Sequence, residues 1–276
     1  MKTRDPDVRR ERWLNRSLCR RYAVVAFSTF SSPPATKNPR EGRTICWAFG
    51  SLIKGETEIL GAWNLDAESA IPTAVFGDLY NRGVEFLRCG LGSLEGLEPA
   101  FLATFRNAAL YPSIEQAFAS AIGAVKPRHR AAMSNLLRAS GGDLVEAAAP
   151  VFLPGSSSED LRQKYPGIVT QWDEAVAGCQ PLLALPEPYR QLVRSVDQAA
   201  RGVQERLVRS IQRHGPFVDS AEAFDFVVDA LWRADARLER DAQAEEPAGL
   251  GLGSGGLASM AGRAVGTPAL AGRVLP

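Results

Sequence analysis

The sequence predicts an α/β protein with a mixed sheet, formed by a three-strand antiparallel meander plus parallel strands, a mostly helical insertion and C-terminal helices. Three observations predict this class. Short apolar runs of strand length lie before residue 66, strand-like and helical stretches alternate from 69 to 113, and helical spacing then continues to about Leu238.

Composition limits the class of protein to which the chain can belong and the cellular compartment that it fits. The chain has 276 residues, of which 45% are hydrophobic and 23% charged, as in ordinary globular proteins. The formal net charge is +1, so no overall field attracts nucleic acid and any basic surface must be local. No apolar run reaches the ~18 residues of a membrane span, and the charged start MKTRDPDVRRERW is not a secretory signal. The four cysteines include no CxxC pair, which predicts neither a zinc site nor a disulfide framework and fits the cytoplasm.

Arginine is concentrated in residues 1–21. Seven arginines lie there: Arg4, Arg9, Arg10, Arg12, Arg16, Arg20 and Arg21. Such a charge run is typical of a solvated basic arm or a short helix, with contact to nucleic acid as the functional alternative.

The meander follows this arm. YAVVAFS (22–28) has the length and apolarity of a buried strand, and the Pro-rich stretch 31–42 predicts a loop. The runs 44–54 and 57–65 flank Gly55-Glu56, and a two-residue loop that opens with Gly favours a tight hairpin. We therefore expect three antiparallel strands.

The parallel strands come next, each separated by a helix. Residues 69–83 have helical spacing and end at Gly83, a residue suited to a helix C-cap. VEFLRCGL (84–91) predicts a fourth strand, residues 94–106 a helix, and ALYPS (109–113) a short fifth strand.

The last long helix, residues 189–213, is strongly amphipathic on a helical wheel. Its apolar sector contains Leu192, Val193, Val196, Ala200, Val203, Leu207 and Ile211. The opposite sector is an arginine face of six residues: Arg190, Arg194, Arg201, Arg206, Arg209 and Arg213. This face is either a solvated surface or a surface that contacts DNA phosphates, for which Arg is the better ligand.

Three parts of the chain are predicted. Residues 1–21 form the basic arm, 22–241 form one domain with a helical insertion at about 126–185, and 242–276 form a Gly/Ala-rich tail. The tail is aperiodic and cannot bury enough apolar surface to order itself, so we expect it to be disordered.

The order β-β-β-α-β-α-β followed by helices is that of the RNase H-like fold, and several stretches resemble the Mutator-type transposases of bacterial insertion sequences. GETEILGAWNLDAESAIPTAVFGDLYNRGVEFL is similar to their strand that leads into a helix ending in L-x-x-R-G-V. GLEPAFLATFRNAALYPSIEQAF resembles their G-F-P-E-A segment. KYPGIVTQWDEAVAGC and the residues after it resemble the segment ending in T-T-N-x-I-E, and HGPFVDSAEAF resembles G-x-F-P. The resemblance covers roughly 22–240.

This resemblance implies DNA cleavage and joining by two Mg²⁺ ions held by two Asp and one Glu. Two metal ions neutralise charge on both the attacking and the leaving oxygen, and hard carboxylate oxygens hold them. Here the first Asp position falls on Ser28 and the second on Gly92. The Glu position falls on Ala200 or on Arg201, depending on whether it is counted from upstream or downstream.

Further family positions are also replaced. The family's Cys and His fall on Ser113 and Gln116, and the Asn before the Glu falls on Asp197 or Gln198. We therefore expect a catalytically inactive relative with no metal cofactor that retains DNA binding through phosphate contacts. A second copy or an active transposase would be its protein partner. The chain also starts almost at the first strand, which suggests that the family's N-terminal DNA-binding part is absent.

Other interpretations of the same residues stay open. Replacement carboxylates would give an active strand-transfer enzyme, and the candidates are Glu95, Glu98, Asp197 and Glu205. Glu95 and Glu98 also suit the first turn of a helix, and Glu205 suits a pair with Arg201 or Arg209. A protein-interaction module without DNA affinity is the third alternative. A phosphate loop at Gly90–Gly96 is disfavoured, because the Gly-Lys-Ser/Thr ending is missing.

Overall fold

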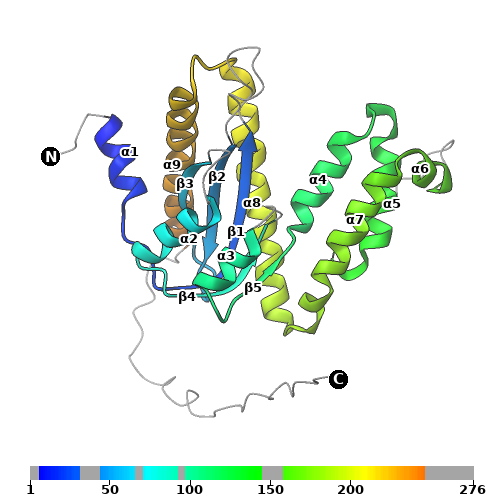
Figure 1. Ribbon diagram of the computed structural model, residues 1–276, viewed down its shortest axis with the longest axis horizontal. Helices are drawn as coiled ribbons and strands as arrows, with labels where there is room; N and C mark the ends of the chain where they lie inside the picture. Colours follow the sequence, from blue (N-terminus) through cyan, green and yellow to red (C-terminus); the bar gives the residue numbers. More distant parts are fainter. Residues whose placement is uncertain (1–5, 32–43, 66–70, 93–96, 145–157, 246–276) are drawn as a thin grey trace, which may run out of the picture.

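The computed structural model describes residues 6–31, 44–65, 71–92, 97–144 and 158–245 (Figure 1). Its strands are β1 (Arg21–Ser31), β2 (Thr44–Ser51), β3 (Thr57–Leu65), β4 (Phe86–Leu91) and β5 (Ala109–Tyr111). Its α-helices are α1 (Pro6–Leu14), α2 (Ile71–Asn81), α3 (Leu97–Thr104), α4 (Ile114–Ala124), α5 (Arg130–Gly141), α6 (Ser158–Lys164), α7 (Pro166–Cys179), α8 (Glu187–His214) and α9 (Ser220–Glu245). None of these described helices combines the length and apolarity needed to cross a membrane.

The five strands form one mixed sheet in the order β3-β2-β1-β4-β5. β1, β2 and β3 pair antiparallel, whereas β4 pairs parallel with both β1 and β5. The predicted meander and parallel strands are confirmed, and the fold is consistent with the RNase H-like class. Gly55 in the hairpin has φ of +92°, a conformation that favours glycine.

The predicted C-cap at Gly83 is also confirmed. Gly83 has φ of +108°, and its N–H donates to the carbonyl of Tyr80. The N–H of Val84 donates to the carbonyl of Leu79, so Val84 belongs to the end of the helix. β4 consequently begins at Phe86, two residues later than the sequence predicts.

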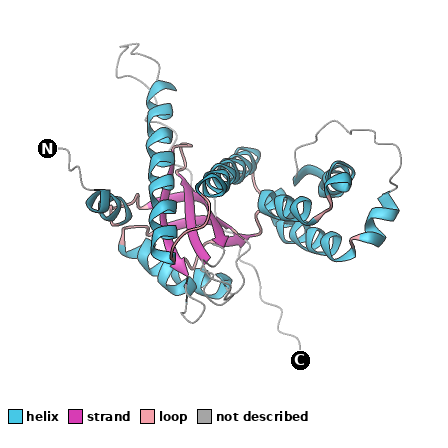
Figure 2. Cartoon of the chain, turned by 90° about the horizontal axis from the view of Figure 1, so that it is seen from above, coloured by secondary structure: helices cyan, strands magenta, loops and turns pink. Residues whose placement is uncertain are grey.

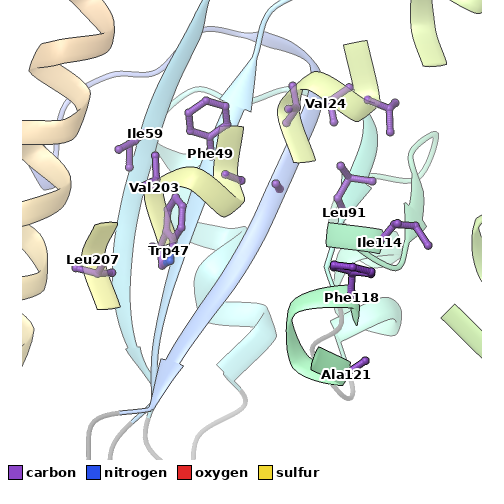
Figure 3. Close-up of a cluster of buried hydrophobic side chains, with 14 of the residues drawn as sticks. Val24, Trp47, Phe49, Ile59, Leu91, Ile114, Phe118, Ala121, Val203 and Leu207 are labelled. Carbon is purple, nitrogen blue, oxygen red and sulfur yellow. The ribbon is translucent and has the colours of Figure 1, made fainter. Parts of the chain in front are cut away.

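Helices cover both faces of the sheet because side chains alternate along β1. Val25 and Phe27 are buried on the face covered by α2 and α3, whereas Val24 and Ala26 belong to the core on the other face. There α8 packs on β1 and β2, and α9 packs on β3 (Figure 1). Figure 3 follows this second core from Trp47 and Val203 to Leu91, Ile114 and Phe118, where the sheet meets α4.

Helices α4 to α7 form a helical lobe to one side of the sheet (Figure 2). Phe118 of α4 packs against Trp172 of α7, with ring centroids 5.9 Å apart. Trp172 is buried and donates to the Ser140 hydroxyl of α5. The helical character expected for most of the chain after Ile114 is therefore present in the described residues, while the boundaries 126–185 of an insertion stay a prediction.

The N-terminal segment differs from a solvated arm. α1 is the short helix that the sequence allows, but Trp13 is buried and its Nε1 donates to Asp235 of α9 at 2.8 Å. Arg16 pairs with Asp235 and Glu58, and Arg10 pairs with Asp225 and Asp229. Solvation is thus the wrong interpretation for these arginines, because α9 supplies carboxylates that a one-dimensional charge count cannot locate.

The C-terminal helix also ends slightly later than the sequence predicts. Residues 242–245, which the sequence assigns to the disordered tail, are the last residues of α9. The remaining tail and the Pro-rich loop after Ser31 lie outside the described residues.

Candidate functional site

The structure places Ser28 of β1 close to Gly92, just beyond the point where the parallel pairing of β1 with β4 ends. Val25 of β1 lies opposite Gly90 of β4, and Ala26 lies opposite Leu91. Ser28 is two residues beyond Ala26 and 2% exposed, and the Gly92 N–H donates to the Tyr111 carbonyl of β5. The carboxyl ends of parallel strands are where α/β proteins place their ligands, so this edge is the candidate site.

Gly92 is also closely packed. A Cβ atom built on it would lie 3.3 Å from both Cβ and the carbonyl oxygen of Phe27. A carboxylate side chain at this position would therefore require β1 to move by a few tenths of an ångström.

Gln116, in the first turn of α4, is the hydrogen-bond donor to Ser28. Its Nε2 donates to the Ser28 hydroxyl at 2.7 Å and to the Phe27 carbonyl at 2.9 Å. Ser113 is the N-cap of α4, and its hydroxyl oxygen accepts from the Gln116 N–H at 3.0 Å. Ser113 and Gln116, at which the resemblance places the family's Cys and His, thus hold the start of α4 against β1.

Asp197 of α8 completes this network from the other side. Its carboxylate accepts from the Ser113 hydroxyl at 2.5 Å and from the Glu115 N–H at 3.0 Å, and the residue is 7% exposed. Burial disfavours a charged carboxylate and raises the pKa of Asp197 to about 6, although the hydrogen bonds from Ser113 and Glu115 act the other way. Both carboxylate oxygens therefore already have protein donors.

Burial distinguishes Ala200 from Arg201, the two residues at which the resemblance places the family's Glu. Ala200 is 1% exposed and belongs to the apolar core. Arg201 instead reaches the rim of the site, where its guanidinium pairs with Glu115 at 2.5 Å and with Glu205 at 2.9 Å. The predicted pair of Glu205 with Arg201 is confirmed, and the position that faces the site carries a cation.

Sequence reasoning missed two residues at this edge. Glu115 is the acid that neutralises Arg201, and Gln204 of α8 bridges the strands. Gln204 accepts from Trp47 Nε1 at 2.7 Å and donates to the Thr29 carbonyl at 3.1 Å. Gln204 lies one helical turn beyond Ala200 and Arg201, so helical spacing was the signal that could have identified it.

A sequence profile described as "Transposase, Mutator family" matches residues 3–233. The chain belongs to the Mutator family of transposases.

Individual relatives agree with this assignment. The chain is 26% identical over 230 residues to a probable transposase for an insertion sequence element of Corynebacterium diphtheriae, covering 82% of this chain and 65% of that protein. It is 25% identical over 230 residues to the transposase for insertion sequence element ISRM3 of Rhizobium meliloti (strain 1021), covering 83% of this chain and 57% of that protein. The chain therefore spans between 57% and 65% of the length of these curated relatives.

The side chains at this Mutator-family site do not fit a pair of Mg²⁺ ions. Hard cations need carboxylate oxygens, but among the described residues Gly92 has no side chain, each Asp197 carboxylate oxygen already accepts a protein hydrogen bond, and Glu115 is paired with Arg201. The nearby thiols of Cys89 and Cys179 are buried, which raises the pKa of each to about 12 and keeps them protonated. Among the described residues, no group of three or more His, Cys, Asp or Glu could hold a metal ion.

The remaining candidate carboxylates do not add to this site. Glu98 is exposed in the first turn of α3, as a helix-dipole charge would be, and Glu95 lies outside the described residues. The two histidines contact aromatic rings elsewhere: His129 Nδ1 lies 2.8 Å from the Tyr165 hydroxyl, and the His214 ring stacks on Phe217.

The predicted arginine face of α8 divides into two parts. Near the start of the helix Arg190 pairs with Glu187, and in the middle Arg201 pairs with Glu115 and Glu205. Arg194 is exposed between them. Arg206, Arg209 and Arg213 are exposed toward the end, and within the described residues no carboxylate forms an ion pair with them.

Proposed function

We propose that this protein is a DNA-binding member of the Mutator family that does not cut or join DNA by the family's two-metal chemistry. The observation that carries the proposal is the hydrogen-bonded network at the ends of β1 and β4. Ser28 is hydrogen-bonded to Gln116, Gln116 to Ser113, and Ser113 to Asp197. Support also comes from Arg201, one of the two residues at which the resemblance places the family's Glu, because its side chain at this site is positively charged.

The physical argument concerns charge. A divalent cation that leaves water must regain the lost hydration energy from anionic ligands, and this site offers one buried carboxylate with its oxygens already occupied. The Arg201 guanidinium at the rim of the site would also repel a bound cation. The described residues of this edge therefore hold the sheet and α4 together, and among them there is no carboxylate array for in-line attack at phosphorus.

A plasmid-nicking assay with Mg²⁺ or Mn²⁺ tests this proposal. We expect supercoiled plasmid to remain intact at every metal concentration, and calorimetric titration with Mn²⁺ to give no heat of specific binding. Metal-dependent nicking that disappears in both Asp197→Asn and Glu115→Gln would overturn the proposal in favour of an enzyme with replacement carboxylates. Circular dichroism of the same samples confirms that each variant is folded.

DNA binding is the second part of the proposal, and it is supported by the exposed arginines near the end of α8. Fluorescence anisotropy of a labelled duplex across a salt series measures it directly, because each phosphate contact contributes about 0.9 to the slope of log K against log salt. A folded sample that binds no duplex at ~50 mM salt would leave the third alternative, a protein-interaction module.

A further inference from the structure

The exposed arginines at the end of α8 face further arginines on α9. Figure 1 shows α8 and α9 side by side on one face of the sheet. A surface depression of about 560 Å³ between them is lined by Arg206, Arg209, Arg213 and Arg237, together with Ser210 and Gln212. We call these residues the α8–α9 groove.

The groove continues into a smaller, deeper pocket. That pocket, of about 110 Å³, shares Arg206, Ser210 and Arg237 with the groove and adds Arg233. Its floor is apolar, formed by residues such as Leu207, Leu231 and Phe226. Neither lining contains a carboxylate, so the polar groups that face this space are guanidinium, hydroxyl and amide groups.

The charge of the groove is not neutralised internally. Of its arginines, Arg233 pairs with Asp229 at 3.6 Å. For Arg206, Arg209, Arg213 and Arg237, the described residues provide no ion pair: Arg209 and Arg213 donate only to α8 carbonyls and to Ser210. Like charges gathered across two helices repel one another, and this repulsion is relieved by an anion.

We infer that the α8–α9 groove binds the phosphodiester backbone of duplex DNA, and that Arg237 of α9 is part of this surface while Arg190 and Arg201 are not. This inference rests on the proposed function and assigns its surface. Charge complementarity decides the occupant, because guanidinium groups bind phosphate oxygens through paired hydrogen bonds. Arg206 and Arg213 are seven residues apart on one helix, a rise of about 10 Å. DNA carries one phosphate per ~3.4 Å of axis on each strand, so this row spans about three phosphates.

The test compares two variants that each remove four positive charges. In the groove variant, Arg206, Arg209, Arg213 and Arg237 are replaced by Gln. The control variant carries the same number of changes to Gln on the exposed basic surface of the helical lobe, at Lys126, Arg128, Arg130 and Lys164. Both are titrated with a labelled duplex by anisotropy across a salt series.

We expect the groove variant to lose three to four units of log–log salt slope, about one for each phosphate contact, while the control keeps the slope of the wild type. A third variant with Lys at the four groove positions should retain most of the slope but bind more weakly, because Lys lacks the paired donors.

The possible outcomes distinguish an error in the groove assignment from an error in the proposed DNA binding. If the wild type binds duplex and the groove variant binds equally well, the groove assignment is wrong and DNA binding survives. If the folded wild type binds polyglutamate but no duplex, the groove belongs to an acidic protein partner, and both statements are overturned. A loss of slope in the control variant alone would move the DNA surface to the helical lobe.

Discussion

In the first half of α8, which ends at Arg201, Arg190 and Arg201 are held by carboxylates of this protein, whereas in the second half, the residues after Arg201, the arginines face other arginines. Arg201 reaches across to Glu115 of α4, and the pair is partly buried. Arg206, Arg209 and Arg213 face α9, which offers Arg237. Because the two halves belong to one helix with one pattern of residues, the difference comes from the neighbouring elements. An arginine face is thus structural where α4 approaches it and available to a ligand where α9 does.

The largest expected effect comes from reversing one charge in each half. Arg201→Glu would place a third carboxylate beside Glu115 and Glu205 without a cation, and should destabilise the protein by about 2–3 kcal/mol. Arg209→Glu, at an exposed position, should change stability by no more than about 0.5 kcal/mol but weaken duplex binding. Urea unfolding and anisotropy of both variants measure the two effects.

The opposite pattern of stability and duplex binding in these two variants would contradict the difference between the two halves of α8. A stable Arg201→Glu protein with weakened duplex binding would show that the first half also contacts DNA. A destabilised Arg209→Glu protein would show that the second half has a structural partner.

The next effect is a pH dependence that originates in the first half. The pKa of Asp197 is raised from 3.8 to about 6 in the folded protein. A raised carboxyl pKa contributes stability that is complete below the unfolded value and is lost as pH rises through the folded value. The size of this contribution is at most about 3 kcal/mol. Asp197→Asn keeps the shape of the side chain and removes its titration.

Urea unfolding of the wild type and Asp197→Asn at pH values from 4 to 7.5 measures this contribution. We expect the stability of the wild type relative to the variant to decrease as pH rises through about 6. A difference that stays constant over the range would mean that Asp197 keeps an ordinary carboxyl pKa.

A smaller effect is expected at Gln116 of α4, whose side chain is hydrogen-bonded to Phe27 and Ser28 of β1. Gln116→Glu replaces the donating amide with an oxygen that faces the Phe27 carbonyl and the Ser28 hydroxyl. The Ser28 hydroxyl can turn and donate to this oxygen, but the Phe27 carbonyl loses its donor and faces a carboxylate, which should cost about 1–2 kcal/mol. Gln171→Glu, at an exposed position of α7, is the matched control and should be neutral. Equal stability of the two variants would contradict the role given to the network.

Much of this organisation is predictable from the sequence, because it depends on local patterns. The hairpin at Gly55, the C-cap at Gly83 and the amphipathic α8 follow from residues that are close together in the chain. The partners of the arginines do not. Glu115 and Arg201 are 86 residues apart, and Trp13 and Asp235 are 222 apart. A helical wheel gives the face on which a residue lies but not the element that packs against that face.

The same reasoning explains the candidate site. Counting along the resembled motifs gives one residue for each of the first two positions, Ser28 and Gly92, but leaves the third position between Ala200 and Arg201. Adjacent residues of a helix point about 100° apart, so only the packing of α8 on the sheet separates them. Ala200 enters the core, and Arg201 reaches Glu115.

The smallest expected effect lies at the border of the two halves, at Gly202. A Cβ atom there would have only one neighbour within 4 Å, Arg206 Nη1 at 3.8 Å, which is ordinary contact. Glycine inside a helix costs about 0.5–1 kcal/mol relative to Ala, so Gly202→Ala should stabilise the protein by that amount. Gly178→Ala in α7 is the opposite case, because its Cβ would lie 2.8 Å from Pro112 Cγ and should destabilise the protein. Thermal unfolding distinguishes the two. If Gly202→Ala stabilises the protein and leaves the salt slope of DNA binding unchanged, the two halves of α8 differ only in what they face. If it destabilises the protein, a neighbouring group must crowd the added methyl group, and the open surroundings given to Gly202 are wrong.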